Sequence, residues 1–314
     1  MSRKRIIAMS GGVGGAKLAE GLARNSNGTP LTLIVNTGDD FNHLGLHISP
    51  DIDTALYTLA GLVNPETGWG RRDETWSFMQ ALEQLGGETW FRLGDADLAM
   101  HVERTRRLAA GETLCDITAD LASRLGILAQ VLAMTDDQVR TRVDTDIGEL
   151  DFQHYFVREQ CRPQVSHIEF KGAAAAQPAP QVIQALQSGE AEAIILCPSN
   201  PYLSIAPILA IPGMRELLRS AGVPVVAVSP LVGGAAVKGP TTKIMDELGL
   251  SVSALQIVED YADLIDGFVL DSRDAHLRDQ IDLPVAVTDT LMRTAHDRLR
   301  VANETLAFAR SLYS

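Results

Sequence analysis

Residues 5–24, RIIAMSGGVGGAKLAEGLAR, determine how the fold of this chain is expected to begin. The apolar run at 5–9 predicts a short buried strand, and the glycine-rich turn after it leads directly into a helix. Ala19 and Leu22 are spaced so that one face of this helix packs on a sheet. A second apolar run, LTLIV at 31–35, completes a βαβ unit. The sequence therefore predicts an α/β fold built on a parallel sheet.

Four apolar runs in the second half of the chain predict further strands of the same sheet. The middle of the chain has a different pattern. We expect a core formed by residues 1–60 and 165–314, and a mainly helical insertion with a β-ribbon at 61–164. A short helix is expected directly after Thr54, at 55–63. The later strands are expected at 191–196, 223–230, 266–271 and 283–290, the helices of the insertion at 74–86, 95–110 and 115–133, and the ribbon at 134–160.

The composition limits the classes of protein to which the chain can belong. It has 314 residues, of which 46% are hydrophobic and 21% charged, as expected of a globular protein with a large core. Its net charge of −13 argues against binding to nucleic acids or to an anionic membrane surface. The sequence contains no apolar run of membrane-spanning length, no signal-peptide pattern and no CxxC spacing, so we expect a cytoplasmic protein.

The glycine turn was tested against two known nucleotide-binding patterns. Gly12 and Gly14 begin a G-x-G, but the third position is Lys17, and the second strand ends at Asn36 where a dinucleotide site needs an acid. A Walker loop also fails, because neither serine nor threonine follows the lysine. Both patterns share backbone N–H groups and a helix N-terminus that face an anion, and this arrangement is kept here. A turn that is rich in glycine only for packing is the alternative.

The stretch 36–54, NTGDDFNHLGLHISPDIDT, places four carboxylates directly after the second strand, Asp39, Asp40, Asp51 and Asp53. In open parallel sheets, ligands bind at the carboxyl ends of the strands. Carboxylates this close together repel one another unless a cation or hydrogen-bond donors offset their charge. Mg²⁺ shared with a phosphate ligand is the usual solution. The alternative is a solvated acidic loop, because Asp, Asn and Gly are common turn residues.

The same stretch contains two histidines, His43 and His47, at a spacing of four residues. On a helix this spacing would suit a zinc ion. Gly45 lies between them and indicates a loop, so zinc is the less favoured interpretation.

Two later loops contain residue types that suit a phosphate ligand. Lysine is rare, at five of 27 basic residues, yet Lys17, Lys238 and Lys243 lie in or just after glycine-rich segments. A lysine there can act as a compact positive charge against phosphate, although chance placement on solvated helix starts is the alternative. Ser199 and Asn200 follow another predicted strand. Because the carboxyl ends of parallel strands share one edge, these loops can converge on one site.

Seven segments, in order along most of the chain, form a joint pattern. They are GGVGGAKL (11–18), NTGDD (36–40), SPDIDT (49–54), GWG (68–70), RLGDADLA (92–99), CPSNPYLSIAPIL (197–209) and SPLVGGAAVKGPT (229–241). Together they closely resemble the 2-phospho-L-lactate transferase family of deazaflavin (coenzyme F-420) biosynthesis. The set is highly specific, whereas the glycine turn alone is not.

The resemblance implies a Rossmann-like three-layer αβα core with a parallel sheet, a smaller helical insertion, dependence on Mg²⁺ and a homodimer. It implies transfer of a phosphorylated three-carbon acid from a guanosine diphosphate-linked donor to the ribityl hydroxyl of 7,8-didemethyl-8-hydroxy-5-deazariboflavin. GMP is the implied leaving group. The sequence leaves open whether the transferred group is phospholactyl, enolpyruvylphosphoryl or phosphoglyceryl.

The resemblance also implies roles for residues. Asp53 and Arg92 are expected to grip the deazaflavin. Asp39, Asp40 and Asp51 are expected to be catalytic and to hold Mg²⁺ on the diphosphate, because displacement at phosphorus needs mainly alignment and charge neutralisation. Which residue takes the proton from the attacking hydroxyl stays open. The donor side is expected to comprise Gly12, Gly14, Gly15, Lys17, Ser199, Asn200, Lys238 and Gly239.

A non-enzymatic function is the alternative. The gluconeogenesis-factor family, whose members are regulatory binders of nucleotide sugars, has the same core. Such a protein would share the first glycine turn but need not keep SPDIDT or Arg92. Both are present, which favours the enzyme.

Overall fold

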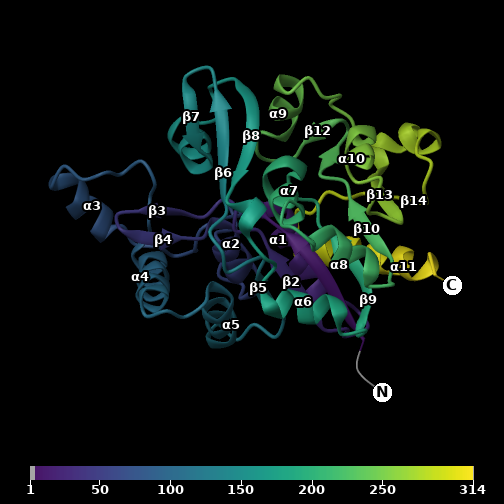
Figure 1. Cartoon of the computed structure of the whole chain (residues 1–314), viewed down its shortest axis with the longest axis horizontal. Coiled ribbons are helices and arrows are strands. Elements are labelled where there is room, and N and C mark those ends of the chain that lie inside the picture. Colours follow the sequence, from purple (N-terminus) through teal and green to yellow (C-terminus); the bar gives the residue numbers. More distant parts are fainter. Residues whose placement is uncertain (1–3, 314) are drawn as a thin grey trace.

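The computed structural model describes residues 4–313 and contains a central sheet of seven parallel strands. The strand order is β14-β13-β10-β9-β1-β2-β5, and helices cover both faces of the sheet (Figure 1). The predicted α/β fold is therefore confirmed. The strands are β1 (Arg5–Ser10), β2 (Leu31–Val35), β5 (Gln130–Ala133), β9 (Ala191–Leu196), β10 (Val225–Val228), β13 (Gly267–Asp271) and β14 (Val285–Thr288).

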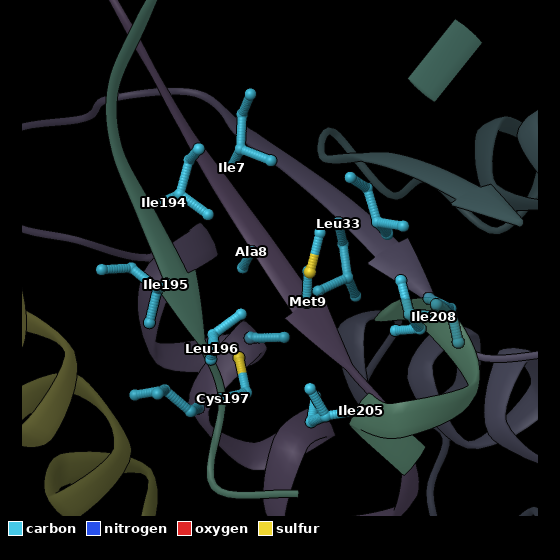
Figure 2. Packing of buried hydrophobic residues seen from close by; sticks show 14 of the residues in the cluster. Ile7, Ala8, Met9, Leu33, Ile194, Ile195, Leu196, Cys197, Ile205 and Ile208 are labelled. Carbon is cyan, nitrogen blue, oxygen red and sulfur yellow. The ribbon is translucent and has the colours of Figure 1, made fainter. Parts of the chain in front are cut away.

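The hydrophobic core lies along the central strands. Figure 2 shows the side chains of Ile194, Ile195 and Leu196 beside those of β1, where Ile7 and Met9 are completely buried. A sheet that is covered on both faces needs apolar residues at successive positions, and this explains the continuous apolar runs of the sequence.

Helix α1 (Gly12–Ala23) packs against α2 (Pro50–Leu59) and α11 (Ala295–Ser311). In Figure 1, α6 (Pro180–Gln187) and α8 (Met214–Ser220) lie in front of the sheet, while α1 and α11 lie behind it. The result is the three-layer arrangement expected of a doubly wound sheet. The remaining helical segments after β8 (Val165–Lys171) are η2 (Ala173–Ala175), η3 (Pro201–Ile205), α7 (Ala206–Leu209), α9 (Thr241–Glu247), α10 (Ala254–Asp260) and η4 (Ser272–Gln280).

Two sequence predictions of local structure were wrong. The helix expected after Thr54 begins at Pro50, because proline is well suited to the first turn of a helix. The acidic stretch is therefore partly helical, with Asp51 and Asp53 in the first turn of α2. The helix expected over 115–133 ends at Arg124, and its last residues form β5, which pairs with β2 at the edge of the sheet.

The residues between β2 and β9 include several smaller elements. They contain the hairpin of β3 (Phe41–His43) and β4 (Leu46–Ile48), and helices α3 (Ser77–Gln84), α4 (Asp95–Ala109) and α5 (Leu114–Arg124). The expected ribbon is a three-stranded sheet in which β6 (Arg140–Thr145) pairs with β7 (Gly148–Asp151) and β8 (Val165–Lys171). A single-turn helix, η1 (His154–Arg158), follows β7. The boundaries predicted for the insertion stay a prediction, with β5 lying inside its range but pairing in the main sheet.

The order of the strands places a ligand site at one point of the sheet. The chain passes from β1 to β2 on one side, and β9 pairs with β1 on the other side. The segments that follow β1 and β9 therefore diverge and leave a crevice at the carboxyl ends of these strands. In open α/β sheets, ligands bind in such a crevice.

Candidate active site

A cavity of about 910 Å³ lies at the carboxyl edge of the sheet, beside the junction of β1 and β9. Loops that follow β1, β9, β10 and β14 form one side of its wall, and the first turn of α2 and the segments after it form the other. Asp40 and Gly15 are buried outside the wall. The other predicted site residues all line it: Gly12, Gly14, Lys17, Asp39, Asp51, Asp53, Arg92, Ser199, Asn200, Lys238 and Gly239.

The glycine turn brings three segments of the chain into contact. The backbone N–H of Gly11 donates to Ser199 Oγ at 3.1 Å, and that of Gly12 donates to Asp51 Oδ1 at 2.7 Å. A Cβ atom on Gly14 would lie 2.3 Å from a backbone oxygen of the loop after β9. The glycines therefore allow the loop after β9 and the start of α2 to approach the N-terminus of α1.

Gly15 has a packing function in this turn. A Cβ atom there would lie 2.3 Å from Ser199 Oγ and 2.4 Å from Ser10 Oγ, inside the packed strand ends. Its position agrees with the packing alternative, whereas Gly12 and Gly14 face the cavity.

We expect Gly14→Ala to lower the free energy of unfolding by about 3 kcal/mol, because the methyl group would overlap the backbone of the next loop. Gly12 has a φ of +63° and no atom within 4 Å of its Cβ position. Gly12→Ala should therefore cost only the left-handed strain, about 1 kcal/mol. Urea denaturation of both variants measures the difference. An equal loss, or a larger loss for Gly12→Ala, would contradict the close approach at Gly14.

Asp39 and Asp51 form a buried acidic pair in the cavity wall. The side chain of Asn36 donates a hydrogen bond to one member of the pair, with its Nδ2 2.9 Å from Asp51 Oδ2. Burial, together with the charge of Asp51, raises the pKa of Asp39 well above its usual range. Burial raises the pKa of Asp51 to about 6, and hydrogen bonds from Asn36 and Gly12 only partly offset this effect. Asp39 Oδ1 has no hydrogen-bond partner among the described residues. A cation bound in the cavity would offset the repulsion between the two carboxylates.

These two carboxylates fit an ion of the Mg²⁺ type. Mg²⁺ commonly takes one or two protein carboxylates and completes its shell with water and phosphate oxygens. Across residues 4–313 there is no cluster of three or more His, Cys, Asp or Glu side chains that would hold a metal by itself. A cation at Asp39 and Asp51 would therefore depend on oxygens of the bound substrate.

Asp40, the third predicted metal ligand, has partners within its own hairpin. Its Oδ2 accepts a hydrogen bond from Ser49 Oγ at 2.8 Å and lies 3.0 Å from His47 Nε2. His43 is on the other strand of that hairpin, and its ring meets the ring of Trp90 edge-on, with a centroid separation of 5.1 Å. The two histidines therefore have separate packing environments, which disfavours the zinc alternative.

The residues predicted to bind the acceptor line the cavity but have different partners. Arg92 lies over the ring of Trp76, with its guanidinium carbon 4.1 Å from the ring centroid. The Asp53 carboxylate forms an ion pair with Arg104, a completely buried residue of α4. Arg92 and Asp53 thus contribute a stacked cation and a paired carboxylate to the wall of the same cavity.

The predicted donor side of the cavity contains two lysines held by backbone oxygens. Lys17 Nζ donates to the backbone oxygen of Met292 at 3.1 Å, and Lys238 Nζ donates to that of Thr67. Burial lowers the pKa of Lys17, and the charges of Arg298 and Lys238 lower it further. Ser199 and Asn200 already use their side-chain oxygens, Ser199 for Gly11 and Asn200 to cap η3. Lys243, the other lysine in a glycine-rich segment, points away to Glu247 and Pro163.

Asp271, which was not among the predicted site residues, supports the predicted donor side of the cavity. This completely buried carboxylate accepts hydrogen bonds from the backbone N–H and the hydroxyl of Thr290 at 2.8 and 2.9 Å. It thereby fixes the loop 290–293, which lines the cavity. Its place as the last residue of a predicted strand was a signal that could have identified it.

The segment after β7 covers part of the cavity. Phe152, Gln153 and Phe156 line the wall. Tyr155 is completely buried beside Lys243, and His154 packs on Trp90 with ring centroids 4.6 Å apart. Neither His154 nor Tyr155 lines the cavity.

A parallel sheet with a cavity at its switch point, lined by a glycine turn and buried carboxylates, defines an α/β protein with a ligand site at the carboxyl edge of the sheet. The family model for 2-phospho-L-lactate transferase CofD matches residues 6–306, and the chain belongs to this family. The resemblance stated from the motifs is thereby confirmed.

Individual relatives agree with this assignment. The chain is 42% identical over 277 residues to a phosphoenolpyruvate transferase of Streptomyces coelicolor, covering 86% of each protein. It is 38% identical over 311 residues to a 2-phospho-L-lactate transferase of Methanocaldococcus jannaschii, covering 98% of this chain and 99% of that protein. A solved structure of a UPF0052 family protein from Bacillus halodurans has a similar fold, with a TM-score of 0.63 at 14% identity over 98% of this chain and 99% of that one.

Within the described part of the chain, none of the helices combines the length and the apolar character that crossing a membrane requires.

Proposed function

We propose that this protein is a Mg²⁺-dependent transferase of coenzyme F-420 biosynthesis. It would move a phosphorylated three-carbon acid group from a guanosine diphosphate-linked donor to the ribityl hydroxyl of 7,8-didemethyl-8-hydroxy-5-deazariboflavin. The observation that supports this most strongly is that the glycine turn, the acidic pair and the predicted acceptor residues all line one cavity. Names of close relatives, a phosphoenolpyruvate transferase and a 2-phospho-L-lactate transferase, support the same reaction class. We also propose a cytoplasmic homodimer.

The proposed reaction is a displacement at phosphorus. The hydroxyl oxygen of the acceptor forms a bond to phosphorus, the bond from that phosphorus to the oxygen of GMP breaks, and the hydroxyl proton is released. Such a reaction needs aligned substrates and neutralised charge. The bound Mg²⁺ would supply positive charge to the diphosphate oxygens.

The residues of this chain divide these tasks. Asp39 and Asp51 would hold the metal, and Lys17 and Lys238 would offset further negative charge on the donor. The backbone of the glycine turn, at the N-terminus of α1, favours an anion at the same place. Asp53 and Arg92 would fix the ring system of the acceptor, so that its hydroxyl chain extends toward the donor.

The reaction is tested by incubating the protein with Mg²⁺, the deazaflavin and each of the three guanylylated donors in turn. Mass spectrometry of the products should show one deazaflavin phosphodiester together with GMP. The donor that gives the highest kcat/KM identifies the group transferred. If no donor gives a phosphodiester, the proposal is wrong.

The regulatory alternative is tested by thermal-shift measurements. A ligand that binds the folded protein raises its melting temperature. We expect GDP with deazaflavin to raise Tm and UDP-sugars to leave it unchanged. The reverse result would favour a nucleotide-sugar-binding regulator.

Arg92→Lys should raise the KM for the deazaflavin by roughly 3- to 30-fold, because lysine keeps the charge but loses the planar stacking on Trp76. Arg106→Lys is the matched control, since Arg106 is an exposed residue of α4 paired with Glu103. Steady-state kinetics with each substrate varied should show a donor KM within about twofold of the unmodified value. An equal rise in both KM values would show that Arg92 does not act on the acceptor alone.

A further inference from the structure

A series of buried polar side chains, Asp53, Arg104, His101, Asp97 and Tyr57, lies behind the acceptor side of the cavity; it is called the polar series below. Arg104 is completely buried, and its two terminal nitrogens each contact a different oxygen of Asp53. The Nη1 atom of Arg104 also lies 3.3 Å from His101 Nδ1, and His101 Nε2 lies 3.2 Å from Asp97 Oδ2. The polar series ends at Tyr57, whose hydroxyl donates to Asp97 Oδ1 at 2.6 Å.

The polar series connects two helices, α2 and α4. Asp53 and Tyr57 are on α2, while Asp97, His101 and Arg104 lie on one face of α4. The backbone N–H of Asp97 donates in turn to a glutamate carboxylate, Glu74 Oε1, at 2.9 Å. The polar series therefore holds α4 against α2, the helix whose first turn contains Asp51.

Packing alone does not explain this arrangement. A buried ion pair is a weak source of stability, and apolar residues of similar volume often stabilise a protein at least as well. The polar series is also open to the cavity, because four of its members line the wall: Asp53, Tyr57, Asp97 and His101. Arg104 does not line the wall. Arg104 is thus the one member that acts on the cavity only through its neighbours.

The contact between Arg104 and Asp53 fixes both the orientation and the hydrogen-bonding character of the carboxylate. A two-point contact with a planar guanidinium holds the carboxylate plane in place. A carboxylate has about four lone-pair positions, and Arg104 occupies two of them. A carboxylate paired with a permanently protonated guanidinium is an acceptor only. The positions that remain can receive an N–H or O–H group of a ligand.

We propose that Arg104 is a positioning residue for the acceptor substrate. It holds the Asp53 carboxylate in one orientation, so that Asp53 accepts a hydrogen bond from an N–H or O–H group on the edge of the substrate's ring system. In this way Arg104 contributes to the choice of substrate. This inference rests on the proposed function, because the acceptor is the deazaflavin of that reaction. His101 and Asp97 extend the support of Arg104 to Tyr57. Ring edges that present only acceptor atoms to Asp53 are excluded by the same geometry.

The test measures equilibrium binding of the deazaflavin, by its fluorescence and without donor, to the Asp53→Asn, Arg104→Gln and doubly substituted proteins. Each single substitution should raise Kd by about tenfold or more, as for the loss of a hydrogen bond to a charged group. Because Arg104 acts through Asp53, the double variant should lose no more affinity than the weaker-binding single variant. In the full reaction, the KM of the donor should stay within about twofold in all three proteins.

Arg107→Gln is the matched control. Arg107 is on the same helix and pairs with Glu112 and Asp120 away from the cavity, so its loss should change Kd by less than about twofold. Arg104→Lys, which keeps the charge but not the fork, should give an intermediate Kd and serves if Arg104→Gln fails to fold.

The outcomes separate the two proposals. If the unmodified protein binds the deazaflavin and Arg104→Gln, or Arg104→Lys in its place, binds it equally well, the positioning function is wrong and the proposed reaction stands. Additive losses in the double variant would likewise overturn it, because they would show that Arg104 acts independently of Asp53. If the unmodified protein does not bind the deazaflavin at all, the proposed reaction fails and the inference fails with it.

Discussion

Asp39→Asn is expected to lower kcat by a factor of about 10²–10³, the size of effect seen when a charge-stabilising group is removed from an active site. The amide has nearly the shape of the carboxylate but no charge. Asp39 lines the cavity, whereas Asp40 does not, so the Asp39 carboxylate is the one that a ligand in the cavity can reach. The Mg²⁺ concentration that gives half the maximal rate should rise in the same variant.

Asp40→Asn is the matched control for this prediction. Asp40 is next in the sequence and equally buried, but it is bonded to Ser49 and His47 and does not line the cavity. Its loss should lower kcat by less than about tenfold and leave the Mg²⁺ dependence unchanged. Initial rates over a Mg²⁺ series, together with deazaflavin binding, measure both effects. A larger loss of kcat in Asp40→Asn than in Asp39→Asn would show that Asp40, and not Asp39, is the charge-stabilising carboxylate.

Asp53→Ala is expected to lower the free energy of unfolding by about 3–5 kcal/mol, because it leaves the buried Arg104 guanidinium without its partner. A loss of this size would obscure any direct effect on binding, so Asp53→Asn is the better substitution for studies of the acceptor. Adding Arg104→Met to Asp53→Ala should recover most of the lost stability, since no unpaired charge is then buried. Urea denaturation of the single and double variants measures both steps.

Asp263→Ala is the control for the loss of a carboxylate partner at the surface. Asp263 pairs with Arg215 and Arg219, and about half of its side chain is exposed, at 49%. Exposed ion pairs contribute little to stability, so the change should be much smaller than for Asp53→Ala. Comparable losses at the two positions would mean that the Asp53 pair is effectively solvated.

The local sequence predicted much of the fold. Apolar runs of four to eight residues predicted β1, β2, β9 and β13 because strands covered on both faces are apolar at successive positions. The joint set of motifs predicted the family, and the glycine turn predicted a helix that begins directly after the first strand. These features depend on residues that are near one another in the chain or on backbone geometry that glycine alone permits.

Where one element ends and the next begins was predicted less well. The start of α2 was missed because Pro50 is equally compatible with a turn and with the first turn of a helix. The four residues of β5 are too few to show a period, so the local sequence does not distinguish this strand from the end of the preceding helix. Pairing with β2 in the folded chain makes this segment a strand.

The sequence by itself determined the parallel sheet and the family, and most of the site residues that it predicted line the cavity. The tertiary structure decided which of these residues are available to a ligand and which are held by the protein. Arg104 illustrates the reason. In α4 it lies close to Arg106 and Arg107, which pair with acidic residues outside the cavity, and its local sequence differs little from theirs. Its spacing from Asp97 and His101 places all three on one face of α4, but only the packing of α4 brings that face to Asp53, 51 residues earlier in the chain. The partner of a buried charge is fixed by long-range packing, and no local pattern of residues records it.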